Sequence, residues 1–155
     1  MFFPAADADG MRHMLAGVLW TIPLVAVLFV LLRLPALQAF HQFVIDTLGP
    51  MFAKVSTGQV LLISTLAGVG EEMAFRWVLQ GGLGPVIGDV QALVVVSLVF
   101  GAVHWLNATY FVLATFMGLF LGWLYLEVGL LAAIVCHAIY DAIALLYLQR
   151  RHAER

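Results

Sequence analysis

The chain has 155 residues, of which 64% are hydrophobic and only 10% charged. Soluble domains have about half of their residues apolar and about a quarter charged, so this chain has too little polar surface to coat a water-soluble particle. The net charge is −2, and the lack of any stretch rich in Lys and Arg argues against a nucleic-acid partner. A single cysteine, Cys136, excludes an intramolecular disulfide and a cysteine-based metal site.

Apolar segments of membrane-spanning length follow one another along the chain. A bilayer core of about 30 Å needs about 20 apolar residues in a helix. The predicted spans cover residues 14–34, 55–80, 90–106, 109–126 and 129–149. Residues 35–50 are mixed in polarity and bracketed by prolines, which predicts an interfacial loop or a short amphipathic helix, and the sequence GGLGP at 81–85 predicts a break after the second span.

The connections between the last three spans are very short, which predicts antiparallel neighbours. Gly118 and Gly122 form a GxxxG face that suits close helix packing. The predicted fold class is therefore all-α, a polytopic membrane helix bundle of about five transmembrane helices, with residues 1–155 as a single membrane domain.

The distribution of basic residues predicts the orientation of the bundle. With the C-terminus in the cytoplasm, Arg12 is the only basic residue outside the spans that lies on the outer side. The residues that then lie inside are Arg33, Lys54, Arg150, Arg151 and Arg155. We therefore expect an integral membrane protein with its N-terminus outside and its C-terminus inside.

Ionisable residues within the predicted spans are the strongest functional signal. A charge at bilayer depth costs about 2.5–3.5 kcal/mol on insertion scales, so such residues rarely serve stability alone. The six residues are Glu71, Glu72, Arg76, His104, His137 and Asp141.

The spacing of these residues predicts which of them pair. Glu72 and Arg76 lie four apart on one helix, which favours an ion pair, and His137 and Asp141 have the same spacing. Glu71 is rotated by about 100° from Glu72 and has no local partner. Measured from the outer end of each span, Glu71 and His137 are predicted at a depth of about 12–13 Å. The corresponding depth for His104 is about 20 Å.

Three motifs together resemble the CPBP family, named for CAAX proteases and bacteriocin-processing proteins. The family patterns EExxxR, FxxxH and HxxxN or HxxxD correspond here to Glu71-Glu72-Met-Ala-Phe-Arg76, Phe100-Gly-Ala-Val-His104 and His137-Ala-Ile-Tyr-Asp141. The family includes type II CAAX prenyl endopeptidases and lysostaphin-resistance protein A-like proteins. The resemblance covers about residues 60–148, which we take as the catalytic core.

The resemblance implies an intramembrane endopeptidase that hydrolyses a peptide bond of a membrane-associated protein or peptide. Glu71 would activate a water with help from His104, while His137 and Asp141 would stabilise the oxyanion. The implied site-organising residues are Glu72, Arg76 and Phe100.

Asp141 departs from the Asn that many family members carry. An ionised Asp only accepts hydrogen bonds and would repel an oxyanion. Either Asp141 is protonated, or it orients His137 as a cationic donor, and the four-residue spacing favours the second interpretation.

Alternatives to this interpretation differ in chemistry or in class. The expected enzyme has no cofactor, but Glu71, His104 and His137 are also suitable ligands for zinc or another divalent metal, although no HExxH motif is present. A non-catalytic scaffold or immunity protein would keep the fold and tolerate loss of Glu71. A proton-coupled carrier would also use buried Glu and His, but the sequence shows no inverted repeat.

The expected partners are those of a small membrane protease. They are membrane lipids, a membrane-anchored peptide or protein substrate, and a second copy of the chain or a partner membrane protein. The small size of the chain favours a prokaryotic plasma membrane as its location.

Overall fold

The structure is a computed structural model that describes residues 8–155, so residues 1–7 of the predicted domain lie outside the description. Within this range the chain forms helices and no strands, which confirms the predicted all-α fold class. The elements in chain order are α1 (Ala8–Leu31), the 3-10 helix η1 (Pro35–Leu37), α2 (Gln38–Phe52), α3 (Thr57–Glu72), the π-helix η2 (Met73–Gln80), α4 (Gly81–Ile87), α5 (Asp89–Val103), α6 (Ala108–Glu127) and α7 (Leu130–Ala153).

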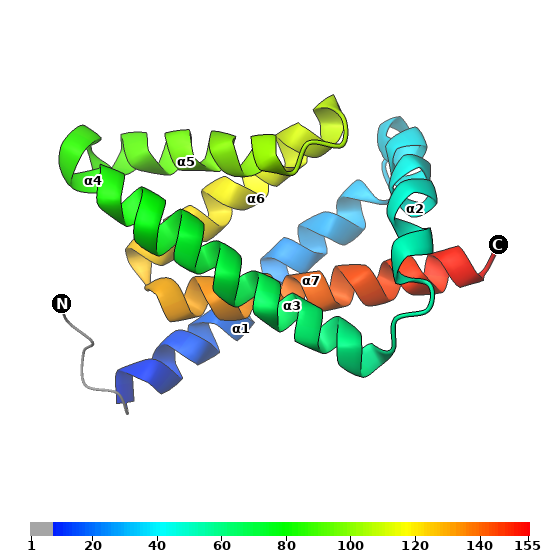
Figure 1. The fold of residues 1–155 in the computed structure, drawn as a ribbon, viewed down its shortest axis with the longest axis horizontal. Helices are drawn as coiled ribbons and strands as arrows, with labels where there is room; N and C mark the ends of the chain where they lie inside the picture. Colours follow the sequence, from blue (N-terminus) through cyan, green and yellow to red (C-terminus); the bar gives the residue numbers. More distant parts are fainter. Residues whose placement is uncertain (1–7) are drawn as a thin grey trace.

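The helices run back and forth between two ends of a bundle (Figure 1). Helices α1, α5 and α7 run towards the end that holds the C-terminus, while the α3–η2–α4 segment and α6 run in the opposite direction. Helix α7 packs against α1, α2, α3 and α6 and so forms the centre of the bundle, while α5 packs against α4, η2 and α6. The three segments that carry the candidate site, α3, α5 and α7, therefore belong to one packed unit.

Small residues allow the helices of this unit to approach closely. A Cβ atom on Gly68 of α3 would lie 3.0 Å from the carbonyl oxygen of Ile134 and 3.1 Å from the Cβ of Ala138, both on α7. A Cβ atom on Gly118 of α6 would lie 3.2 Å from the Cα of Ser97 on α5. The close packing predicted for the GxxxG face is thus confirmed at Gly118.

The break predicted at residues 81–85 is wrong. Helix α4 continues the chain in helical conformation to Ile87, and the break comes at Gly88, which has a φ of 93°. A positive φ is accessible to glycine because it has no Cβ. Residues 81–85 stay helical because α4 packs along α5, and tertiary packing overrides a weak local helix propensity.

The predicted interfacial segment at 35–50 forms η1 and α2. Together they make an angle of 109° with the long helix that follows. Side chains on one face of α2, including His41 and Ile45, are buried against α7. The turn after α2 is also held to α7, because Gln149 Nε2 donates to the carbonyl oxygens of Phe52 and Val55, each at 2.7 Å.

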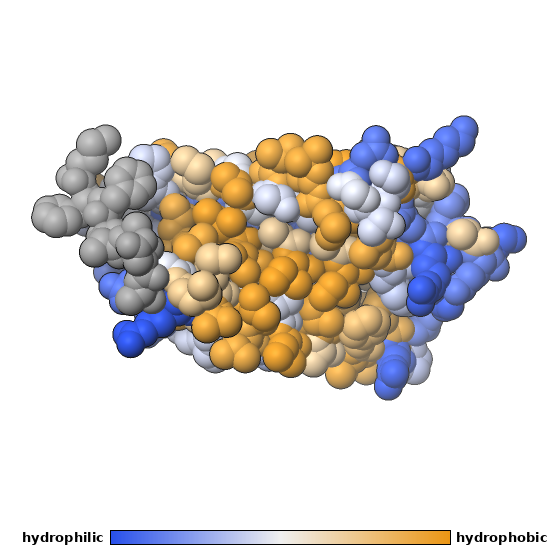
Figure 2. All heavy atoms as spheres, turned by 90° about the horizontal axis from the view of Figure 1, so that it is seen from below, coloured by the Kyte–Doolittle hydropathy of each residue, from blue (hydrophilic) through white to orange (hydrophobic). Residues whose placement is uncertain are grey.

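The described helices form a polytopic membrane bundle. By length and apolar composition, α1, α6 and α7 can each cross a membrane, and a fourth crossing follows if η1–α2 and the segment from Thr57 to Ile87 are one bent span. Helix α5 is apolar but has only 15 residues, about 22 Å at 1.5 Å per residue and less than a bilayer core. Length and composition thus support three to four of the about five predicted spans. Figure 2 shows the expected apolar band across the middle of one face, with polar residues gathered at the C-terminal end.

Candidate functional site

A buried ion pair lies where α3 passes into η2. Glu72 is the last residue of α3, and its Oε2 accepts a hydrogen bond from Arg76 Nε at 3.1 Å, with both side chains fully buried. This confirms the pairing predicted from the spacing. The π-helical turns of η2 begin at the next residue, Met73. Such turns are frequent at functional sites, because they re-aim side chains that a regular helix would place elsewhere.

The second oxygen of Glu72 holds His137 of α7. His137 Nδ1 lies 2.8 Å from Glu72 Oε1. A carboxylate paired with Arg76 can only accept, so Nδ1 carries the proton and donates it. His137 Nε2 then faces the other way, 3.4 Å from Asp141 Oδ2 and 4.0 Å from Glu71 Oε2. The sequence analysis favoured Asp141 as the residue that orients His137. In the structure Glu72 makes the shorter contact, at Nδ1, and Asp141 lies beside the opposite nitrogen, Nε2.

His104 is anchored in the same way from a third helix. It directly follows α5, and its Nδ1 lies 2.8 Å from the carbonyl oxygen of Phe100. A carbonyl only accepts, so Nδ1 donates and Nε2 is left facing Glu71, with Oε2 at 3.4 Å. Anchoring one imidazole nitrogen fixes both the tautomer and the direction of the other.

The depths predicted for Glu71 and His104 differ by about 7 Å because the predicted second span ends too early. With α4 continuing to Ile87, Glu71 lies about 24 Å along the helix from that end. His104 follows the 15 residues of α5, which places it at about 22 Å. The two residues therefore lie at similar distances from the turn between α4 and α5, which allows their side chains to meet.

Glu71 lies at the point where these side chains converge. Its side chain is 32% exposed, whereas that of Glu72 is fully buried. The Oε2 atom of Glu71 is buried and has no hydrogen-bond donor among residues 8–155. It lies between the Nε2 atoms of His104 and His137. The two adjacent glutamates thus have different environments, one in an ion pair and one at an open centre.

Phe100 packs between the components of the site. Its ring centroid is 4.4 Å from that of His104 and 6.1 Å from that of His137. The guanidinium carbon of Arg76 lies 5.4 Å from the same ring centroid. Phe100 thus contacts both histidines and the buried cation, which agrees with the site-organising role that the family resemblance implies.

The sequence analysis missed Gln80, and it identified Gly122 only as part of a helix-packing face. Gln80 lies four residues after Arg76, accepts from Arg76 Nη1 at 3.3 Å, and donates from Nε2 to the carbonyl oxygen of Gly122 at 3.0 Å. The signal that could have found it is the repeated four-residue spacing of polar residues from Glu72 through Arg76 to Gln80 in an apolar span. No sequence pattern pointed to the carbonyl group of Gly122.

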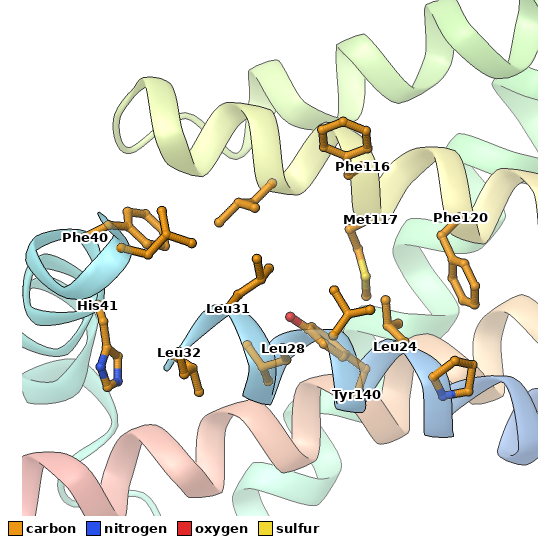
Figure 3. A pocket seen from close by; sticks show the side chains of 14 residues that line it. Leu24, Leu28, Leu31, Leu32, Phe40, His41, Phe116, Met117, Phe120 and Tyr140 are labelled. Atoms are coloured by element: carbon orange, nitrogen blue, oxygen red, sulfur yellow. The ribbon is translucent and has the colours of Figure 1, made fainter. Parts of the chain in front are cut away.

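The site opens into a cavity of about 450 Å³. Its polar wall is formed by His41, Glu71, His104, Tyr110, His137, Tyr140, Asp141 and Tyr147, and the remaining wall is apolar. An adjoining groove of about 380 Å³, which we call the α1–α6 groove, is lined by apolar side chains of α1, α2 and α6, with Tyr140 at its base (Figure 3). The cavity and the groove lie side by side, and they share Leu28, Leu32, Phe40, His41, Leu113, Met117 and Tyr140 as wall residues.

Glu71, His104 and His137 are the alternative metal ligands that the sequence suggests. In the part of the chain that the structure describes, no three His, Cys, Asp or Glu side chains are arranged to hold a metal ion. Glu71 Oε2 and the two Nε2 atoms are the expected zinc ligand types, and Oε2 lies 3.4 Å from Nε2 of His104 and 4.0 Å from Nε2 of His137.

Comparisons with known proteins give a consistent picture. A family model described as "Type II CAAX prenyl endopeptidase Rce1-like" matches residues 53–143. No curated protein matches the chain, and no solved structure does. The matched region contains all three motifs, from Glu71 to Asp141, and it covers more than half of the chain. The chain therefore belongs to the Rce1-like family of type II CAAX prenyl endopeptidases.

Proposed function

We propose that this protein is an intramembrane endopeptidase in which Glu71 activates the attacking water. The observation that carries the proposal is the position of Glu71 Oε2, which lies 3.4 Å from His104 Nε2 and 4.0 Å from His137 Nε2 at the wall of the cavity. Membership of a protease family supports hydrolysis of a peptide bond, and the apolar surroundings support a substrate delivered by the membrane.

The first step is activation of the water. A water bound between Glu71 and His104 donates one hydrogen to Oε2 and the other to the lone pair of Nε2, which is free because Nδ1 donates to Phe100. Buried acceptors of this kind are normally satisfied by protein or water donors. As the water oxygen forms its bond to the scissile carbonyl carbon, Glu71 takes the first proton as general base.

The second step is stabilisation of the oxyanion. His137 as an imidazolium donates from Nδ1 to Glu72 and presents Nε2–H to the cavity. Asp141, 3.4 Å from Nε2, favours this charged form but cannot itself donate to the oxyanion. A fixed donor aimed at developing charge in an apolar site contributes more than it would in water.

The third step breaks the C–N bond. Glu71 returns the proton it accepted to the leaving amine nitrogen, the carbonyl re-forms, and the carboxylic acid product carries the oxygen of the water. No oxidant, reductant or covalent enzyme intermediate is required. The residues are thus regenerated in their starting protonation states.

The substrate proposed for this site is a membrane-anchored protein or peptide with an apolar segment near the scissile bond. The cavity wall outside its polar part consists mainly of Leu, Phe, Met and Val side chains, with no Lys or Arg. Maturation of a secreted peptide and removal of a membrane anchor from a surface protein both present such a segment. A free carboxylate or phosphate group finds no cationic side chain other than histidine in this cavity.

The experiment that tests the proposal compares the wild type with Glu71→Ala in liposomes. Cleavage of a library of membrane-anchored peptides is followed by mass spectrometry, with and without a metal chelator. Glu127→Ala is the matched control, because Glu127 is exposed at the end of α6. We expect cleavage by the wild type and the control, its loss in Glu71→Ala, and no effect of chelator.

The remaining outcomes separate the alternatives. Loss of cleavage with chelator and recovery with zinc would replace the water-activating role of Glu71 by a metal-dependent mechanism. Identical behaviour of the wild type and Glu71→Ala would contradict the enzyme and support the non-catalytic scaffold.

A further inference from the structure

A buried chain of polar contacts runs from α6 to the candidate site. It begins at the carbonyl oxygen of Gly122, which accepts from Gln80 Nε2 at 3.0 Å. Gln80 Oε1 accepts from Arg76 Nη1 at 3.3 Å, and Arg76 Nε donates to Glu72 at 3.1 Å. His137 donates to the other oxygen of Glu72 and ends the chain at the cavity. Gln80 is the member of this chain that contributes a side chain from outside the three sequence motifs.

Gln80 supplies a contact that the guanidinium of Arg76 needs. Arg76 is fully buried, and Glu72 binds only its Nε. Of the two remaining nitrogens, Nη2 has no acceptor among the described residues, so Gln80 provides the second fixed contact of the group. Two contacts fix the plane of a guanidinium, whereas one leaves it free to turn about its hydrogen bond. Gln80 itself is 1% exposed, so its amide cannot exchange these partners for bulk water.

The backbone of α6 fixes Gln80 in turn. Gly122 leaves room for both side chains, because a Cβ atom there would lie 2.6 Å from Gln80 Oε1 and 3.0 Å from Arg76 Nη1. The carbonyl oxygen of Gly122 belongs to a rigid helix, so the amide of Gln80 has a fixed direction. The two hydrogen bonds also define that amide, since its nitrogen must face Gly122 and its oxygen must face Arg76.

The direction of Arg76 determines the direction of Glu72. One oxygen of Glu72 faces the guanidinium and the other faces His137 Nδ1, so a rotation of the ion pair would move the acceptor of the imidazole. His137 Nε2 would then leave its place 4.0 Å from Glu71 Oε2. We propose that Gln80 is a positioning residue, which holds Arg76 against Glu72 and thereby aims His137 at the reacting centre. This rests on the proposed function for its effect on cleavage, but the positioning itself can be measured without cleavage.

The test uses Gln80→Met, which keeps the length of the side chain and removes both hydrogen bonds. Gln42→Met on the exposed face of α2 is the matched control. We expect Gln80→Met to lower kcat by about 10-fold to 100-fold, the range found when a partner behind a catalytic group is removed. KM should stay within about 2-fold, because Gln80 does not line the cavity.

A double-mutant cycle separates positioning from packing. In an Arg76→Lys background the guanidinium is gone, so Gln80→Met should cost less than about 3-fold in kcat, because neighbours that act through each other are not additive. An equal loss in both backgrounds, or the same loss in Gln42→Met, would overturn the proposal.

The second readout does not depend on cleavage. In ¹⁵N-labelled protein in micelles, the Nδ1 proton of His137 is identified by its loss in His137→Gln. We expect Gln80→Met to shift or broaden this resonance and to speed its exchange with water, with no change in Gln42→Met. An unchanged resonance would overturn the positioning role even if the protein proved not to be a protease. A changed resonance in a protein without cleavage would instead contradict the proposed function alone.

Discussion

The two adjacent glutamates show how one step along a helix separates structure from chemistry. Glu72 faces α7 and is fully buried between Arg76 and His137. Glu71 faces the cavity, and 32% of its side chain is exposed. The burial of the first is compensated by a cation and an imidazole donor, while the second has no donor for Oε2 among the described residues. Equivalent substitutions at the two positions should therefore have different consequences.

We predict that Glu71→Gln folds and does not cleave, while Glu72→Gln loses stability. Removing the base should lower kcat by about 10²- to 10⁴-fold with little change in the unfolding midpoint. Removing the charge of Glu72 leaves Arg76 buried without an anion, which typically costs about 3 kcal/mol or more in the free energy of unfolding. Thermal unfolding in detergent and cleavage of one peptide measure both effects. A stable Glu72→Gln protein would show that the ion pair is not what keeps Arg76 buried.

The motif residues could be predicted from the sequence because their cost in a membrane makes them conspicuous. The Glu72–Arg76 pair followed from four-residue spacing on a single helix. The bond from Glu72 to His137 joins residues 65 positions apart. Local spacing carries no information about this bond, so the sequence analysis favoured Asp141 as the residue that orients His137.

At the scale of elements, η2 packs against α6. The π-helical turns of Met73–Gln80 present Arg76 and Gln80 to α6, and Gly122 is the position that receives them. The hydropathy of the segment indicates a span, but it does not distinguish π-helical from α-helical turns. The extent of the helix to Ile87 was missed for a related reason, because glycine-rich sequences are helical only where packing supports them.

We predict that Gly122→Ala is destabilising and lowers cleavage. A Cβ atom there would lie 2.5 Å from Leu93 Cδ1 and 2.6 Å from Gln80 Oε1, and overpacking of this kind typically costs about 1–3 kcal/mol. Gly82→Ala is the control, because a Cβ atom on Gly82 meets nothing within 4 Å. Unfolding midpoints and kcat of the two variants give the comparison. Equal midpoints would mean that α6 moves away from η2 at little cost.

At the scale of the whole molecule, the apolar band and the alternating helices indicate that the described chain lies across a bilayer (Figures 1 and 2). Composition and hydropathy are sufficient to predict this class of protein, because so few charged residues are present to cover a surface in water. The number of crossings is harder to predict, because α5 is short and the segment from Thr57 to Ile87 is charged in its middle. Both departures from an ordinary span occur where helices carry site residues.

We predict that Lys54 and Arg155 lie on the cytoplasmic side and Glu127 on the opposite side. The turn before α3 and the end of α6 lie at opposite ends of the bundle (Figure 1), and basic residues gather at the end with the C-terminus. Single cysteines at the three positions, in a Cys136→Ser background, are treated with a membrane-impermeant maleimide on intact cells. Only Glu127→Cys should react before lysis. Labelling of Lys54→Cys in intact cells would show that the protein has the opposite orientation.

The α1–α6 groove has a consequence for how the protein is handled. Its walls are mainly Leu, Phe and Met side chains, and it adjoins the cavity of the candidate site (Figure 3). The alkyl tail of a solubilising detergent matches such a wall as well as any apolar substrate segment does. We therefore expect the detergent to compete with the substrate, so that the apparent KM rises with the mole fraction and tail length of the detergent. Rates measured in micelles of different detergents would then differ, because the detergent tails occupy the α1–α6 groove to different extents.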